Sequence, residues 1–229
     1  MQIKVCGMRD PENIHAVKEL GIDYMGLIFW PKSPRYVGTI NVNAGTMPNL
    51  PCQLDTDGTP AETNQKQPAL VGVFVNEMPQ TVVTCAYNYR LDYIQLHGNE
   101  STIYIDNLRR TLVPDILPNV RIIKALSICE ADDVKRWREY AGHVDLFLFD
   151  TKCESMGGSG KQFDWSVLNG YDGDTPFLLS GGIGPEDVER IKAFQHPKCI
   201  GIDINSRFET APALKDTERL RTFIHQIKD

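Results

Sequence analysis

The sequence predicts an α/β fold, a closed (β/α)₈ TIM barrel, and the pattern of its apolar residues is the main reason. Eight short apolar runs recur along the 229 residues, with helix-compatible stretches between most of them. The runs are continuously apolar rather than alternating, as strands of a parallel sheet covered on both faces require. An open doubly wound sheet is the alternative. It usually has fewer strands and a glycine-rich first turn, which Cys6-Gly7-Met8-Arg9 is not.

The eight runs are the expected strands, because each is bounded by Gly, Pro or polar residues. They are Ile3–Cys6, Tyr24–Phe29, Leu70–Val75, Tyr93–Leu96, Arg121–Leu126, Val144–Phe149, Phe177–Leu179 and Cys199–Ile204.

Four helices can be placed by apolar residues spaced three or four apart. The first has Asp10 as N-cap and Pro11 at its first position, both favourable start signals. The third begins behind Gly184-Pro185. The four expected helices are Pro11–Leu20, Ala131–Ala141, Pro185–Phe194 and Asp216–Ile227.

One segment interrupts this alternation. Residues 38–68 are dense in Gly, Pro, Thr and Asn and have no helical stripe. The second outer helix is therefore expected to be short or absent, and part of the segment mobile.

Composition narrows the classes of function. A chain of this length is expected to form a single barrel domain over residues 1–229. Its 24 Lys and Arg against 30 Asp and Glu give a net charge of −6, which argues against nucleic-acid and acidic-membrane binding. A small anionic substrate remains compatible with this net charge. We expect a cytoplasmic protein, because no signal-peptide stretch or long apolar run is evident.

Cysteine spacing gives no sign of a metal or disulfide framework. The six cysteines are scattered and form no C-x-x-C pair, so a zinc site is not expected and the thiols are expected to be reduced.

Barrel enzymes place their active sites at the carboxyl ends of the strands. The segments expected there are Cys6-Gly7-Met8-Arg9, Trp30–Tyr36, Gln95-Leu96-His97-Gly98, Asp150-Thr151-Lys152, Ser180-Gly181-Gly182 and Asp203-Ile204-Asn205-Ser206. A glycine-rich loop before Lys161 is similar to a P-loop. ATP binding is rejected, however, because Ser155 and Gln162 replace the first Gly and the Ser/Thr of that motif.

Together these segments resemble the phosphoribosylanthranilate isomerase family of tryptophan biosynthesis, which converts N-(5-phosphoribosyl)anthranilate to its 1-deoxyribulose isomer. The resemblance runs from residue 4 to about residue 209 and rests on seven motifs in order. They are Lys4-Val5-Cys6-Gly7, Pro31–Tyr36, Val71–Asn76, Gln95–Gly98, Asp150-Thr151-Lys152, Gly157–Trp165 and Leu179–Gly182.

The resemblance implies that Cys6 is the general base and Asp150 the general acid of a cofactor-free, metal-free isomerase. Without it, Cys6 is typical of a buried strand thiol and Asp150 of a helix N-cap or surface ion pair. For these roles the thiol pKa must fall below about 8.5 and the carboxyl pKa must rise above about 3.9.

The resemblance also assigns the binding residues. Arg35 would hold the anthranilate carboxylate, and Asp203 would lie near the sugar. The loop before Lys161 would cover the site, and His97 is expected to be a structural hydrogen-bonding residue. The phosphate is expected at Gly181, Gly182, Asn205 and Ser206.

The phosphate loop departs from the family pattern, since Arg207 stands where the family has Gly. Arg207 either contacts the phosphate or points to solvent, and we expect the latter.

Three alternatives remain. Indole-glycerol-phosphate synthase would need a strand-end Lys with a Glu partner, and ribulose-phosphate epimerase a His/Asp metal set; neither pattern is evident. A catalytically silent phosphate binder would not need Cys6 and Asp150.

The expected partner is a small-molecule substrate, and the chain is expected to be a monomer.

Overall fold

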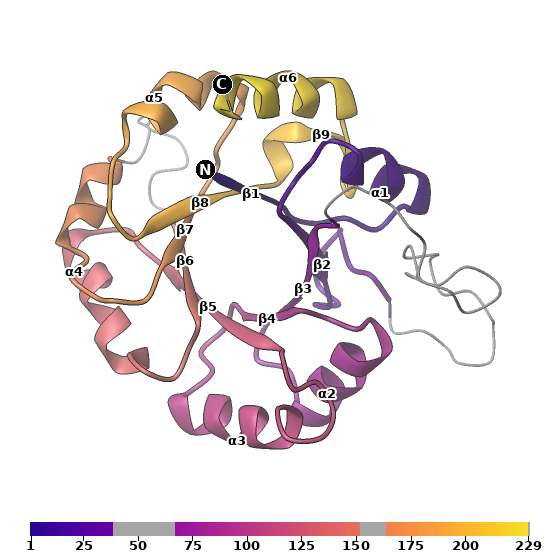
Figure 1. Cartoon of the computed structure of the whole chain (residues 1–229), viewed down its shortest axis with the longest axis vertical. Helices are drawn as coiled ribbons and strands as arrows, with labels where there is room; N and C mark the ends of the chain where they lie inside the picture. Colours follow the sequence, from indigo (N-terminus) through magenta and orange to yellow (C-terminus); the bar gives the residue numbers. More distant parts are fainter. Residues whose placement is uncertain (39–66, 152–163, 229) are drawn as a thin grey trace.

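Eight parallel strands close into a barrel in the computed structural model, which describes residues 1–38, 67–151 and 164–228 (Figure 1). The strands follow one another in chain order, and pairing of the first with the last closes the ring, with Gln2 beside Gly201 and Val5 beside Ile204. They are β1 (Gln2–Val5), β2 (Tyr24–Ile28), β3 (Ala69–Phe74), β4 (Tyr93–Leu96), β5 (Arg121–Ser127), β6 (Leu146–Asp150), β7 (Phe177–Ser180) and β8 (Cys199–Ile204). The predicted barrel is confirmed.

Helices surround the strands (Figure 1). In the described ranges they are α1 (Pro11–Lys18), α2 (Pro79–Asn88), α3 (Thr102–Leu112), α4 (Ala131–Val134), α5 (Val188–Ala193) and α6 (Thr217–Lys228). Among these described helices, none has the length and apolar character needed to cross a membrane.

Two predicted helices have a different form. The stretch Ala131–Ala141 contains one α-helical turn, α4, followed by a 3₁₀ helix at Lys135–Tyr140. The stretch after Gly184 begins as a 3₁₀ turn, Pro185–Asp187, before α5. Apolar spacing alone does not separate these forms, because 3₁₀ turns are frequent at helix ends. The prediction of a short or absent second outer helix falls on residues 39–66, outside the described residues.

The core has two parts because successive side chains of a strand point to opposite faces of the sheet. The larger cluster packs strands against helices and includes Phe147, Phe149 and Phe177. The smaller cluster is formed by alternate strand residues, among them Val71, Ile123 and Leu148.

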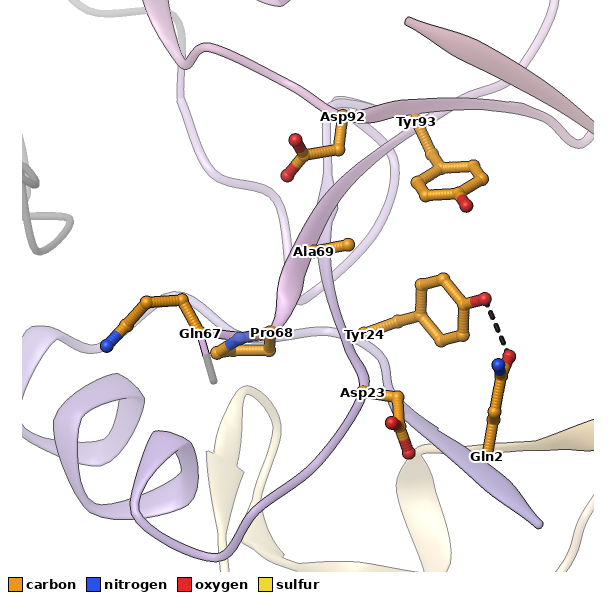
Figure 2. Close-up of a pocket in the computed structure, with 8 residues that line it drawn as sticks. All are labelled: Gln2, Asp23, Tyr24, Gln67, Pro68, Ala69, Asp92 and Tyr93. Carbon is orange, nitrogen blue, oxygen red and sulfur yellow. Dashed lines mark hydrogen bonds between the residues drawn. The ribbon is translucent and has the colours of Figure 1, made fainter. Parts of the chain in front are cut away.

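At the amino end of the barrel, aspartate side chains stabilise the strands by binding backbone groups. Carboxylates that precede strands accept a backbone N–H from the neighbouring strand: Asp23 from Ile3 at 3.0 Å, and Asp92 from Leu70 at 2.7 Å. A pocket of about 290 Å³ lies there, lined by both carboxylates and by Tyr24 and Tyr93 (Figure 2). These carboxylates already bind backbone groups, as expected for the end of the barrel opposite the catalytic one.

One expectation about cysteines was wrong. Among the described residues, Cys6, Cys85 and Cys199 are free thiols, but Cys129 is disulfide-bonded. Spacing along the chain does not show which sulfurs meet in space.

The α1 N-cap is confirmed and gives a stability test. The Asp10 carboxylate accepts a hydrogen bond from the backbone N–H of Asn13 at 2.9 Å. We predict that Asp10→Ala lowers the free energy of unfolding by about 1 kcal/mol, and that Asp10→Asn lowers it by only a few tenths, because Asn also caps. Urea denaturation measures both. Equal losses in the two variants would contradict the capping role.

Candidate active site at the carboxyl ends of the strands

Cys6 directly follows β1, and its backbone N–H donates to the carbonyl of Ile204 at 2.9 Å. The residue is 5% exposed. A Cβ atom at Gly26, on β2, would lie 2.8 Å from the Cys6 sulfur. Glycine at position 26 therefore provides the space that the thiol occupies.

Lys4 and Asp203 form a buried ion pair beside the thiol. They are partners in the β1–β8 register, and the Lys4 ammonium lies 2.8 Å from the Asp203 carboxylate. The second carboxylate oxygen accepts from the Ser180 hydroxyl at 3.1 Å. Asp203 was predicted to be a site residue, but Lys4, although part of a quoted motif, was assigned no role.

The pKa of Cys6 is higher than that of an ordinary thiol. Burial is the largest cause, and the charge of Asp203 adds to it. The positive charges of Lys4 and Lys215 act in the opposite direction without overcoming burial. The expectation that the site lowers the thiol pKa is therefore wrong for this structure, because desolvation penalises the thiolate more than the lysines stabilise it.

Arg35 is held by Glu209 through two parallel hydrogen bonds. Its Nε lies 2.8 Å from Oε1 of Glu209 and its Nη2 lies 2.5 Å from Oε2. Within the described residues, Nη1 of Arg35 has no hydrogen-bond partner. A guanidinium has five N–H donors, so its Nη1 edge can still bind a carboxylate.

Glu209 and Lys215 lie on a hairpin that the sequence did not indicate. Its strands are β9 (Glu209–Ala211) and β10 (Leu214–Lys215), which follow β8. The Lys215 ammonium donates to Glu209 at 2.5 Å and to the side-chain oxygen of Asn205 at 2.7 Å. Burial lowers the pKa of Lys215, and Glu209 opposes that effect.

Gly7 lets these groups come close together. Its φ is +78°, and a Cβ there would lie 2.6 Å from Cδ of Arg35 and 2.7 Å from the side-chain oxygen of Asn205. Any other residue would be strained and would collide with both. The residue after Cys6 thus contacts a predicted carboxylate-binding residue and a predicted phosphate-binding residue.

Asp150 is the last residue of β6 and faces His97. The His97 Nε2 lies 3.5 Å from the Asp150 carboxylate, and the His97 Nδ1 lies 3.1 Å from the amide nitrogen of Gln95. An amide nitrogen donates, so His97 Nδ1 is the acceptor in this contact. The predicted structural hydrogen bond of His97 is present, and the contact with Asp150 was not foreseen.

The predicted phosphate residues lie on adjacent loops. Gly181 and Gly182, with φ of +113° and +70°, follow β7, while Asn205 and Ser206 follow its neighbour β8. Together they bring backbone groups of two loops to one side of the barrel mouth. Lys161 and the glycine-rich loop lie outside the described residues.

Arg207 spans these two loops. It forms an ion pair with Glu186 and remains about half exposed, at 53% of its side chain.

Within the described residues, no group of His, Cys, Asp and Glu is arranged to hold a metal ion.

Glu209 gives a pH-dependent prediction. Burial raises its pKa, but hydrogen bonds from Arg35 and Lys215 outweigh burial and lower the pKa below the ordinary value. A lowered folded-state pKa contributes stability above the unfolded value of about 4.3, and that stability is lost as the pH falls further.

We predict that Glu209→Gln lowers the free energy of unfolding by about 3 kcal/mol at pH 7, because it leaves buried cations unpaired. The gap from wild type should persist at pH 5 and shrink at pH 3.5, as followed by urea denaturation. Glu218→Gln, in an exposed pair with Arg221, is the control and should change stability by less than about 0.5 kcal/mol. A gap independent of pH would contradict the prediction.

Known proteins share this fold and much of this sequence. The family model described as N-(5'phosphoribosyl)anthranilate (PRA) isomerase matches residues 55–226. An N-(5'-phosphoribosyl)anthranilate isomerase of Parabacteroides distasonis is 47% identical over 227 residues, which are 99% of this chain and 93% of that protein. One of Phocaeicola vulgatus is 42% identical over 228 residues, covering 100% and 98%.

Solved structures give the same result. Phosphoribosyl anthranilate isomerase from Thermotoga maritima has a TM-score of 0.74 and 31% identity, covering 100% of this chain and 98% of that one. A phosphoribosyl anthranilate isomerase in complex with reduced 1-(o-carboxyphenylamino)-1-deoxyribulose 5-phosphate has a TM-score of 0.73 and 28% identity, with the same coverage. The chain therefore belongs to the N-(5'-phosphoribosyl)anthranilate isomerase family.

Proposed function

We propose that this chain isomerises N-(5-phosphoribosyl)anthranilate to 1-(2-carboxyphenylamino)-1-deoxyribulose 5-phosphate, a step of tryptophan biosynthesis, with Cys6 as general base and Asp150 as general acid. The observation that carries the proposal is the joint position of these groups at the carboxyl ends of β1 and β6. A single barrel domain over residues 1–229, acting as a monomer, is part of the proposal.

Two anion-binding regions support this substrate. The Nη1 edge of Arg35 fits the anthranilate carboxylate, and the loops after β7 and β8 fit the phosphate. The ligand bound to the relative described above carries both a carboxylate and a phosphate. We propose that the substrate binds with its carboxylate at Arg35, its phosphate at the loops after β7 and β8, and its sugar between the two regions, near Asp203. Lys161, in the proposed covering loop, completes the binding set.

Ring opening comes first. Asp150, in its acid form, donates a proton to the ribose ring oxygen as the C1′–O bond breaks. The lone pair of the anthranilate nitrogen forms a C1′=N iminium, and the proton from Asp150 prevents negative charge from accumulating on the leaving oxygen. A positioned acid typically contributes about 10²–10⁴-fold to such a step. The Nε2 of His97 faces Asp150 and orients its carboxyl group.

Proton transfer from C2′ follows. The Cys6 thiolate takes the C2′ proton, and the electrons of the C–H bond form a C1′=C2′ double bond while the iminium nitrogen becomes neutral. The enol hydroxyl then loses its proton and C1′ gains one, giving the ketone. C1′ is reduced and C2′ oxidised within one molecule, so the chemistry requires a proton donor and a proton acceptor and no external oxidant.

The thiol needs help to act as a base. Its pKa is raised in this structure, and the charges of Lys4 and Lys215 reduce that rise. Cations beside a thiol favour the thiolate that removes the proton. A silent phosphate binder would need neither this thiol nor a carboxyl group at the end of β6.

The residue roles are tested by Cys6→Ala and Asp150→Asn. We predict that each lowers turnover of phosphoribosylanthranilate, followed by loss of its fluorescence, by at least about 10²-fold, because each removes one proton-transfer group. Binding of the reduced product analogue should change little. Cys85→Ala, which removes a buried free thiol on α2, is the matched control. Turnover within tenfold of wild type in either variant would refute that residue's role.

The carboxylate role of Arg35 predicts a different outcome. Arg35→Met should weaken binding of the reduced product analogue by about tenfold or more, because a charge-assisted hydrogen bond contributes roughly 1.5–3 kcal/mol. The control is Arg9→Met, since Arg9 contacts only the carbonyl of Pro34 within the described residues. Isothermal titration calorimetry gives both affinities. Unchanged affinity in Arg35→Met would remove Arg35 from the binding site.

A further inference from the structure

The Lys215 ammonium is buried, and all of its donors are used. Its side chain is 0% exposed. It contacts three acceptors: Glu209 at 2.5 Å, the side-chain oxygen of Asn205 at 2.7 Å and the backbone oxygen of Asn205 at 3.4 Å. An ammonium has three N–H donors, and a neutral amine has two. The arrangement is that of a charged lysine.

The backbone of Lys215 is fixed as well. Its N–H donates to the side-chain oxygen of Asn13 at 2.8 Å, and its carbonyl accepts from the Asn13 amide nitrogen at 2.9 Å. Asn13 is buried on α1. A side chain of one helix thus holds the backbone at the end of β10 in place.

Among the described residues, the charged groups joined in ion pairs at the Cys6 site do not cancel while the thiol is neutral. Lys4 on β1 is paired with Asp203 on β8, and Arg35, after β2, is paired with Glu209 on β9. Lys215 on β10 shares Glu209 with Arg35. Three cations and two carboxylates leave one positive charge in excess. Ionisation of Cys6 brings the sum of these groups to zero.

Lys215 is also connected to both predicted binding regions, the carboxylate region at Arg35 and the phosphate region at Asn205. Through Glu209 it supports the bidentate hold on Arg35, and through Asn205 it supports the loop that follows β8. The Asn205 side chain in turn lies against Gly7, the residue after the thiol. The lysine is therefore joined to each predicted binding region by a single hydrogen-bonded neighbour.

We propose that Lys215 is a positioning residue of this active site, which supplies the excess positive charge facing Cys6 and holds Arg35 and Asn205 in place through Glu209. The proposal rests on the proposed role of Cys6 as the base. It assigns a function to a residue that belongs to none of the motifs from which the family resemblance was drawn.

The test is the pH dependence of Cys6 alkylation by iodoacetamide, read from the mass of the Cys6 peptide in the folded, full-length protein. Lys215→Gln keeps hydrogen-bonding capacity and removes the charge. Its alkylation midpoint should rise by about one pH unit, a tenfold lower thiolate fraction at a given pH. Lys215→Arg keeps the charge and should stay within about 0.3 unit of wild type. The acid limb of the pH profile of kcat/KM should shift by the same amount as the alkylation midpoint.

Lys124→Gln is the matched control. Lys124 is another fully buried lysine, paired with Glu100 at 2.9 Å and lying near the Tyr140 ring, 5.4 Å from its centroid. Its replacement should destabilise the fold without moving the Cys6 midpoint, because it is not among the charges acting on the thiol. If Lys215→Gln does not fold, Glu209→Gln decides. Glu209 is the carboxylate that pairs with the Lys215 ammonium at 2.5 Å, so its loss should leave the Lys215 charge uncompensated and lower the Cys6 midpoint.

An unchanged midpoint in folded Lys215→Gln, or in Glu209→Gln when that variant decides, would overturn the proposal. So would equal shifts in Lys215→Gln and Lys124→Gln. Alkylation needs no turnover, so it is read separately from the proposed function. Full activity of Cys6→Ala would refute the proposed role of Cys6 as the base, whereas an inactive Cys6→Ala with an unmoved Lys215→Gln midpoint would refute only this inference.

Discussion

Among the described residues, four charged groups act on one thiol at the mouth of this barrel, and a fifth, Glu209, pairs with two of them. The cost of burying these charges shapes the rest of the site. An unpaired buried charge would be expensive, so each cation is matched to a carboxylate or to several oxygens. Lys4 is paired with Asp203, and Glu209 is shared by Arg35 and Lys215. Because Glu209 binds Nε and Nη2 of Arg35, the Nη1 edge of the guanidinium remains for a ligand. The same pairing keeps cations beside a thiol that burial alone would hold neutral.

The barrel makes this arrangement possible because its strands are parallel and in register. The β1–β8 register sets Lys4 beside Asp203, and the following residues, Cys6 and Asn205, then leave their strands at the same end of the barrel. Two glycines provide the space that these side chains need. The absence of a side chain at Gly26 leaves room for the Cys6 sulfur, and its absence at Gly7 leaves room for Arg35 and Asn205. The opposite end satisfies strand backbone groups with aspartates such as Asp23. The stabilising aspartates and the candidate catalytic residues thus lie at opposite ends of the same strands.

Local patterns in the sequence predicted the strands well, because a strand buried on both faces must be continuously apolar. All eight expected strands are present. Cys6 and Asp150 lie at the carboxyl ends of β1 and β6, Asp203 is the penultimate residue of β8, and Arg35 lies in the segment that follows β2. The β9–β10 hairpin could not be predicted in this way. Its strands are two and three residues long and carry no apolar run. The partners of the site residues were equally hidden, since Lys4 and Asp203 are 199 positions apart and Arg35 and Glu209 are 174 apart. The direction of the Cys6 pKa shift depends on burial, which no local motif encodes.

The central claim is that this site isomerises phosphoribosylanthranilate. It is tested most directly by adding wild-type protein at micromolar concentration to that compound and following both its anthranilate fluorescence and the appearance of the deoxyribulose phosphate by mass-selective chromatography. We expect enzyme-dependent loss of fluorescence with matching formation of the ketone, which has the same mass and a different retention time. Fluorescence that decays no faster than in buffer, with no ketone formed, would contradict it.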